Sequence, residues 1–156
     1  MVDVKDKDSI VLSYFRNNAR TSLTRMSKAI KIPVSTIYDK LKSYEENDVI
    51  KKHTSIVDFN KLDYGVRVQL LIRCFKESKE HVLRFLMKSP KINNVYRISN
   101  GFDFMVEAIF KSIDEFDQFL RKLDDLKLDK RQEFFVMEDV RREDFLTFKQ
   151  NIGVIR

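Results

Sequence analysis

The side chains best suited to recognise another molecule lie on one face of a helix predicted from about Val34 to Asn47. At about 100° per residue, the face opposite Ile37, Leu41 and Tyr44 carries two hydroxyls, an acid and a lysine, which are Ser35, Ser43, Asp39 and Lys42. Thr36 and Tyr38 flank this face. Such groups make hydrogen bonds to base edges in the major groove of DNA. A face that is only solvated usually carries long Glu/Lys pairs four residues apart. The pattern therefore favours contact with bases over simple solvation.

Positive charge is concentrated around this predicted helix. The 156 residues have a formal net charge of +6 and a sequence pI of about 9.4. Between Arg16 and Lys52 there are nine basic and four acidic residues, so this stretch alone has a net charge of +5. Lys51 and Lys52 stand just after the helix. This distribution fits a polyanionic partner such as double-stranded DNA.

Catalytic and metal-binding chemistry finds little support in the sequence. His53 and His81 have no evident catalytic partner, and the single cysteine, Cys74, excludes an internal disulfide and a cysteine-based metal cluster. No glycine-rich phosphate loop, zinc-ligand spacing or Ser-His-Asp order stands out. We therefore expect no metal, no cofactor and no enzymatic activity.

Composition limits the class of protein further. With three glycines and two prolines in 156 residues, a turn-dense sandwich or propeller is excluded, and helices and strands must dominate. No apolar run approaches the roughly 18 to 20 residues that span a bilayer, and the first residues do not form a signal-peptide core. We expect a cytoplasmic protein with no membrane partner, made of two small domains rather than one medium one.

Three short amphipathic helices are predicted in the first half of the chain. Their expected inner faces are Ile10, Val11, Tyr14 and Phe15; Leu23, Met26, Ala29 and Ile30; and Ile37, Leu41 and Tyr44. Ser22 or Thr24 can cap the second helix, which ends near Lys31, and Pro33 suits the start of the third. β-Prone residues from Val49 to Val57 predict a strand, as in the wing of a winged helix-turn-helix.

The second half predicts the order β-α-β-β-α-β. Alternation predicts strands at 66–74, 92–98, 102–110 and 132–140, and an Asn100-Gly101 turn joins the middle two. One helix lies around Val82 to Leu86, and another begins near Ser112 with Ile113, Phe116, Phe119, Leu120 and Leu123 on its buried face. The fold class is thus α+β, with a ferredoxin-like second half.

Helices on one side of such a sheet leave its other face uncovered. We expect Leu71, Phe75, Met105 and Ile109 or their strand neighbours to be exposed there in a monomer, which favours a homodimer. After the last strand, Phe145, Phe148 and Ile152 follow a helical spacing, and we expect a short packed helix in the tail.

Taken together, these features resemble the Lrp/AsnC family of transcriptional regulators. The resemblance covers nearly the whole chain and rests on Asp8 with Ile10 and Leu12, on Asn18-Ala19-Arg20, on Leu23-Thr24-Arg25-Met26-Ser27, on Tyr44-Glu45-Glu46-Asn47-Asp48-Val49-Ile50, and on Ser99-Asn100-Gly101-Phe102-Asp103-Phe104. It implies DNA binding through the first half, dimers through a RAM-type ferredoxin-like second half, and often an amino-acid effector at contacts between dimers.

The resemblance also implies domain limits and site residues. It gives a winged helix-turn-helix at 1–57, a linker at 58–65, a dimerisation and effector domain at 66–140 and a tail at 141–156. Ser22, Thr24, Arg25, Lys51 and Lys52 would contact DNA beside the reading residues Ser35, Thr36, Tyr38, Asp39 and Lys42. Paired third helices would read a palindromic operator, and the dimers could assemble further into a tetramer or octamer.

The effector site implied by the resemblance is the loop that contains Ser99, Asn100, Gly101 and Asp103. Where the family often has glycine, this chain has Asn100 in the loop and Asp48 after the third helix. Asn and Asp tolerate left-handed backbone best among non-glycine residues, so we expect both turns to survive. The Asn100 side chain, however, takes space near the backbone that a ligand would use, and we expect weak or no response to ordinary amino acids.

Two alternatives belong to other classes of function. The first is an enzyme similar to the sirohaem decarboxylases, which have the same architecture. Those enzymes carry a Trp-rich motif in the corresponding loop, whereas this chain has no tryptophan. The second alternative is a module that binds amino acids or a partner protein through the second half, with the helical half as a vestige. The concentration of basic residues in the first half argues against the idea that this half has lost its function.

Overall fold

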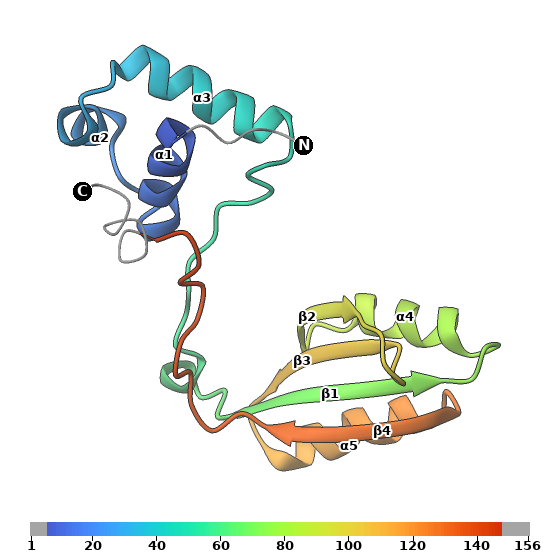
Figure 1. Ribbon diagram of the computed structural model, residues 1–156. Coiled ribbons are helices and arrows are strands. Elements are labelled where there is room, and N and C mark those ends of the chain that lie inside the picture. Colours follow the sequence, from blue (N-terminus) through green and yellow to red (C-terminus); the bar gives the residue numbers. More distant parts are fainter. Residues whose placement is uncertain (1–5, 148–156) are drawn as a thin grey trace. The chain divides into compact units, whose positions relative to one another are not determined.

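The computed structural model describes residues 6–147, which form two compact units (Figure 1). One unit contains residues 6–56 together with 140–147, and the other is Val57–Asp139. The chain therefore passes between the units twice, once near residue 57 and again near residue 140.

The first unit contains helices α1 (Asp6–Asn17), α2 (Leu23–Ile30) and α3 (Val34–Glu46). Ser22 caps α2, since its hydroxyl accepts a hydrogen bond from the Arg25 N–H at 3.2 Å, and Lys31, at φ 55°, ends it. Five residues are buried between the helices: Val11, Phe15, Met26, Ile37 and Tyr44. The predicted inner faces of α1 and α3 are confirmed, whereas Ala29 is exposed.

A polar cluster also fastens α3 to α1. The Asp8 carboxylate accepts a hydrogen bond from the Tyr44 hydroxyl at 2.5 Å and forms an ion pair with Lys40. Burial, together with this carboxylate, raises the pKa of Tyr44 well above its ordinary value. Tyr44 therefore remains a protonated donor to Asp8 at neutral pH.

The strand predicted at Val49–Val57 is wrong. Residues 51–58 have no regular secondary structure, and the described part of this unit contains no strand with which they could pair. A lone strand leaves its backbone N–H and C=O groups without partners, so β-propensity alone does not produce one. Asp48 does take the left-handed conformation expected of it, at φ 55°.

The tail differs from its prediction as well. Residues 141–147 form bends and turns instead of a helix, Phe145 is 77% exposed, and the rest of the predicted helix lies outside the described residues. The segment is instead fastened to α1 by Arg16, which donates to the carbonyl oxygens of Glu143 (3.0 Å) and Phe145 (3.2 Å) and pairs with the Glu143 carboxylate (3.0 Å).

The second unit has the predicted β-α-β-β-α-β order and is a ferredoxin-like fold. After a 3-10 helix, η1 (Phe59–Leu62), its elements are β1 (Val66–Cys74), α4 (Lys79–Lys88), β2 (Ile92–Arg97), β3 (Phe104–Phe110), α5 (Ile113–Asp124) and β4 (Leu128–Phe135). The antiparallel sheet has the order β2-β3-β1-β4. β4 lies earlier in the chain than the predicted 132–140, because its pairing with β1 starts at Cys74↔Leu128 and ends at Val68↔Phe135.

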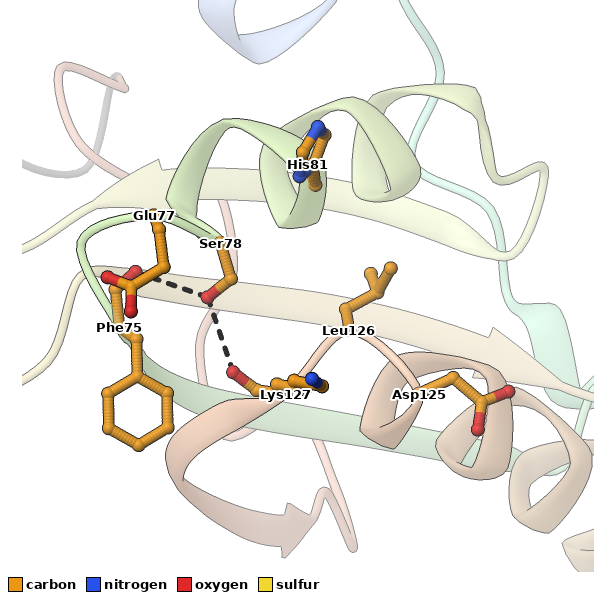
Figure 2. Close-up of a pocket in the computed structure, with 7 residues that line it drawn as sticks. All are labelled: Phe75, Glu77, Ser78, His81, Asp125, Leu126 and Lys127. Carbon is orange, nitrogen blue, oxygen red and sulfur yellow. Dashed lines mark hydrogen bonds between the residues drawn. The ribbon is translucent and has the colours of Figure 1, made fainter.

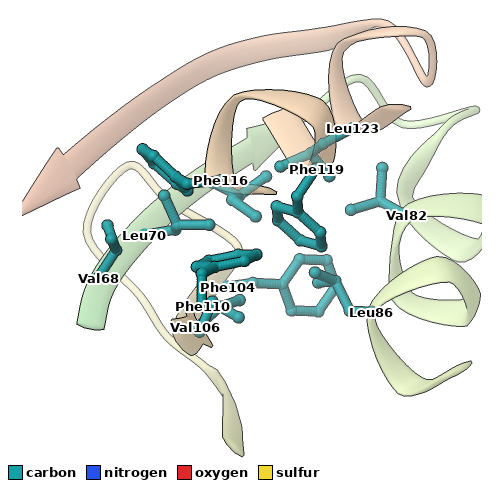
Figure 3. Packing of buried hydrophobic residues seen from close by; sticks show 12 residues of the cluster. Val68, Leu70, Val82, Leu86, Phe104, Val106, Phe110, Phe116, Phe119 and Leu123 are labelled. Atoms are coloured by element: carbon teal, nitrogen blue, oxygen red, sulfur yellow. The ribbon is translucent and has the colours of Figure 1, made fainter. Parts of the chain in front are cut away.

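Both helices of this unit cover the same face of the sheet (Figure 3). Alternate residues of β1 and β3 pack with Val82, Leu86, Phe116, Phe119 and Leu123 of the two helices. The Phe110 ring lies 5.3 Å from Phe116 and 5.4 Å from Phe119, between centroids. Ile113, predicted on the buried face of α5, is half exposed, because it is the first residue of the helix.

The opposite face of the sheet has no helix over it. Tyr96, Phe134 and the neighbouring Phe75 are each about half exposed, and Leu71 and Met105 are partly exposed. Ile109 is an exception to the prediction, since it is 8% exposed at a position paired with the long side chain of Arg67. A partly open surface thus extends over four strands, where apolar and aromatic side chains alternate with the polar Arg67, Gln69, Glu107 and Gln132.

Candidate functional site

The residues predicted to contact bases lie together on α3. Ser35, Thr36, Tyr38, Asp39 and Lys42 are all exposed, and Tyr38 is 56% exposed. They stand opposite the buried Ile37 and Tyr44, so the packing that fixes α3 also directs this face outward. Lys42 lies 3.7 Å from Glu46, one turn later, in a solvent-exposed pair that contributes little to stability.

The residues predicted to contact phosphates are exposed on two other segments of the same unit. Thr24 and Arg25 lie in the first turn of α2, directly after its cap Ser22. Lys51 and Lys52 lie in the irregular segment after α3. The neighbouring His53 connects this segment to α3, because its Nε2 lies 2.9 Å from the Glu45 carboxylate.

The predicted effector loop connects β2 and β3 by a tight turn. Asn100 and Gly101 have φ values of 68° and 88°, so Asn100 takes the left-handed conformation expected of it. The Ile98 N–H donates to the Asp103 carbonyl at 3.0 Å and closes the loop. Ser99, Asn100 and Gly101 are exposed.

In contrast to these exposed residues, the Asp103 side chain makes contacts within its own unit. Its carboxylate accepts a hydrogen bond from the Cys74 N–H at 2.8 Å and forms an ion pair with Lys79. These two contacts lower the pKa of Asp103, with the backbone N–H as the larger cause. Asp103 thus fixes the loop to the end of β1 and the start of α4. Burial raises the pKa of the Cys74 thiol to about 11, so this cysteine stays unreactive at neutral pH.

A pocket of about 600 Å³ lies beside these anchors, between the start of α4 and the turn after α5 (Figure 2). It is lined by Phe75, Glu77, Ser78, His81, Asp125, Leu126 and Lys127. The Ser78 hydroxyl joins the two sides, since it lies 3.1 Å from the Phe75 carbonyl oxygen and 3.3 Å from that of Lys127. This pocket could not be predicted from the sequence, because its residues come together only in the folded unit.

Two classes of site are not found in the part of the chain that the structure describes. Within residues 6–147 no three His, Cys, Asp or Glu side chains come together as metal ligands. No helix among those residues is long and apolar enough to cross a membrane.

Comparisons with known proteins define the class as transcriptional regulators. Residues 67–145 match the family model for the Lrp/AsnC ligand binding domain. The glutamate uptake regulatory protein of Zymomonas mobilis is 25% identical over 145 residues, which cover 90% of this chain and 88% of that one. The HTH-type transcriptional regulator FL11 of Pyrococcus horikoshii is 28% identical over 119 residues, covering 76% and 79%.

The solved structures agree with this class at the level of the fold. A transcriptional regulator of Neisseria meningitidis, crystallised as a complex with L-methionine, superposes with a TM-score of 0.81 at 16% identity and covers 91% of this chain and 94% of that one. The chain belongs to the Lrp/AsnC family of transcriptional regulators.

Proposed function

We propose that this protein binds specific DNA sequences through a helix-turn-helix formed by α2 and α3. The observation that carries the proposal is the exposed polar face of α3, within the stretch where basic residues outnumber acidic ones by nine to four. The irregular residues 51–57 would act as a wing without strand pairing. Relatives named as transcriptional regulators support the same function.

In this proposal the two helices have separate roles. α3 enters the major groove and places Ser35, Asp39 and Lys42 against base edges, where a good contact discriminates by roughly 1 to 3 kcal/mol. Ser22, Thr24 and Arg25 on α2 and Lys51 and Lys52 after α3 contact phosphates, and Thr36 and Tyr38 flank the reading face. Two copies related by a twofold axis read a palindromic operator with half-sites about 34 Å apart.

Selection of bound duplexes from a random pool, followed by titration of variants, tests this assignment. We expect Ser35→Ala and Lys42→Ala to weaken binding to the selected operator more than to random DNA. Arg25→Ala and Lys52→Ala should weaken both alike and reduce the salt slope by about one unit each.

Lys88→Ala removes an exposed lysine from α4 in the other unit and serves as the matched control. Its affinity and salt slope should equal those of the wild type. If Ser35→Ala and Lys42→Ala both keep the operator preference of the wild type, this face of α3 does not contact the bases.

We further propose that the protein is a homodimer, or a tetramer or octamer of dimers, that pairs through the uncovered sheet face. Burying apolar surface contributes about 25 cal/mol per Å² before association costs, and this face carries Leu71, Met105, Tyr96 and Phe134. Sedimentation at micromolar concentration should give at least twice the chain mass of 18.6 kDa. A monomer would contradict the proposal.

Effector binding is the third element of the proposal. The loop of Ser99, Asn100, Gly101 and Asp103 would lie at a contact between dimers, and the pocket beside α4 offers an apolar wall with charged groups at its edge. The L-methionine complex of a structural neighbour makes an amino-acid-like ligand the class to test first.

The decarboxylase alternative is not favoured, because the relatives are named regulators. The protein would act in the cytoplasm.

A further inference from the structure

After β4 the chain leaves the second unit and returns to the first between Asp139 and Val140. The residues on the two sides of this crossing are each held by an arginine of their own unit. Asp139 is held on one side and Glu143 on the other, and only Val140, Arg141 and Arg142 lie between them. Val140 is 88% exposed. A short stretch of chain is thus anchored at both of its ends.

Arg67 of β1 is the anchor in the second unit. Its guanidinium donates two hydrogen bonds to the Asp139 carboxylate, and its backbone carbonyl accepts one from the Val136 N–H at 2.9 Å. Arg67 also forms an ion pair with the buried Glu107, with 3.2 Å between the Nε atom and the carboxylate. Because a carboxylate on either side compensates its charge and its side chain is largely buried, Arg67 is a firm point of attachment.

Arg16, near the end of α1, is the anchor in the first unit. It pairs with the Glu143 carboxylate at 3.0 Å, and it donates to the carbonyl oxygens of Glu143 and Phe145 at 3.0 and 3.2 Å. A planar guanidinium with several donors holds the backbone of the segment in this way, and not only one side chain.

Chain length limits how far the two anchored residues can separate. An extended chain spans at most about 3.6 Å per residue, so the four steps from Asp139 to Glu143 span no more than about 14 Å. The other connection runs from His53, which contacts Glu45 of α3, to Asp58, which caps η1. Its five steps span up to about 18 Å, and the His53 contact is a single pair between half-exposed side chains. The connection after β4 is therefore the tighter one.

We propose that residues 139–143 form a strap that fixes the spacing of the two DNA half-sites, with Arg16 and Arg67 as its positioning residues. The inference rests on the DNA-binding dimer proposed above. In that dimer each α3 reaches its half-site only as far as the strap of its own chain allows. An operator with half-sites further apart binds only the fraction of protein whose strap is detached from α1, so its apparent affinity is reduced by that fraction.

Gel-shift titration of the full-length protein with two operators tests the inference. One is the palindrome selected from the random pool. The other is the same palindrome with two base pairs added at its centre, which moves the half-sites about 7 Å further apart and rotates one against the other by about 70°. The wild type should bind the lengthened operator at least about tenfold more weakly.

Arg16→Gln removes the anchor in the first unit and raises the detached fraction. We expect the affinity for the lengthened operator, relative to the selected one, to rise about fivefold over the wild type. Arg20→Gln removes an exposed arginine from the same unit without touching the strap, and it should leave this ratio unchanged. Loss of charge alone would weaken binding to both operators alike.

A lengthened strap gives a second test that leaves both anchors in place. Insertion of Gly-Ser-Gly-Ser between Val140 and Arg141 adds up to about 14 Å and should relax the ratio at least as much as Arg16→Gln does. The same insertion between Thr54 and Ser55, in the longer connection, should keep the ratio of the wild type. Circular dichroism and thermal unfolding establish that each variant is folded.

The outcomes separate this inference from the function on which it rests. If no duplex is enriched from the pool, or the enriched duplex has a single half-site, the DNA-binding dimer itself fails and the inference with it. If a palindrome is recovered but the wild type accepts both operators equally, or the strap insertion keeps the wild-type ratio, the strap does not set the spacing. If Arg16→Gln weakens both operators alike, Arg16 is a DNA contact and not a positioning residue.

Discussion

At the scale of single residues, Asp103 and Asn100 have different tasks within the same loop. Each oxygen of the Asp103 carboxylate accepts one hydrogen bond, from the Cys74 N–H and from Lys79. Asn100 contributes a backbone conformation, φ 68°. Asp103 is thus a positioning residue of the loop, whereas Asn100 shapes its turn.

Asp103→Asn should destabilise the second unit by about 1 kcal/mol at pH 7, because it removes the ion pair with Lys79 and weakens the bond from Cys74. The pKa of Asp103 is lowered on folding, so its contribution is fully present above the unfolded value of about 3.9 and is lost as the pH falls through the lower folded value. Urea unfolding should therefore show a difference from wild type at pH 7 that shrinks below pH 3. Asp117→Asn, the same change on an exposed part of α5, should show no difference at either pH.

Asn100→Ala should destabilise the protein by about 1 kcal/mol, since alanine adopts left-handed backbone less readily than asparagine. Asn100→Gly should be close to neutral, because glycine adopts this conformation freely but loses more entropy on folding. Thermal unfolding of both variants measures the difference, with Ser99→Ala as the control in the same loop. Equal stability of the alanine and glycine variants would contradict the positive φ at this position.

At the scale of elements, periodicity predicted every helix and strand whose apolar face packs on a local neighbour. The alternation in β1 and β3 and the helical spacing in α3 and α5 each correspond to a buried face. The strand at Val49–Val57 failed because secondary structure there depends on a partner that the local sequence does not reveal. The contact between Arg16 and Glu143 had no sequence signal, since 127 positions separate the two residues.

Arg16→Gln should release the segment 140–147 from α1. The variant loses the donors to two carbonyl oxygens and the ion pair with Glu143. We expect this loss to raise the population in which the segment is detached from α1 about fivefold. Trypsin cleavage after Arg141 and Arg142 should accelerate by the same factor. Arg20→Gln removes an exposed arginine and one cleavage site from the same unit, and it should leave the rate unchanged. Equal rates in both variants would mean that Arg16 does not hold the segment.

At the scale of the whole molecule, the sequence predicted which side chains of α3 are exposed but not how polar groups are grouped in space. The α3 face follows from one helical period, and Ser35, Thr36, Tyr38, Asp39 and Lys42 are exposed as expected. The contact of the Glu107 carboxylate with Asn93 and Asn94, the pocket beside α4 and the Asp8–Tyr44 contact join residues from different elements, so only the folded chain brings them together. Assembly is also a property of this scale, because the uncovered sheet face and the effector loop would be completed by other copies.

The response to amino acids can be tested on the assembled protein. We expect calorimetric titration with each of the twenty amino acids to show no binding tighter than about millimolar, because the Asn100 side chain lies where a ligand carboxylate would approach the backbone. Asn100→Gly should then gain binding to at least one of them, since the loop remains fixed by Asp103. A micromolar ligand of the wild type that is lost on Asp103→Ala would contradict the expectation and would show that the freedom of Gly101, at φ 88°, is sufficient for binding. If neither the wild type nor Asn100→Gly binds any amino acid, Asn100 is not what prevents binding.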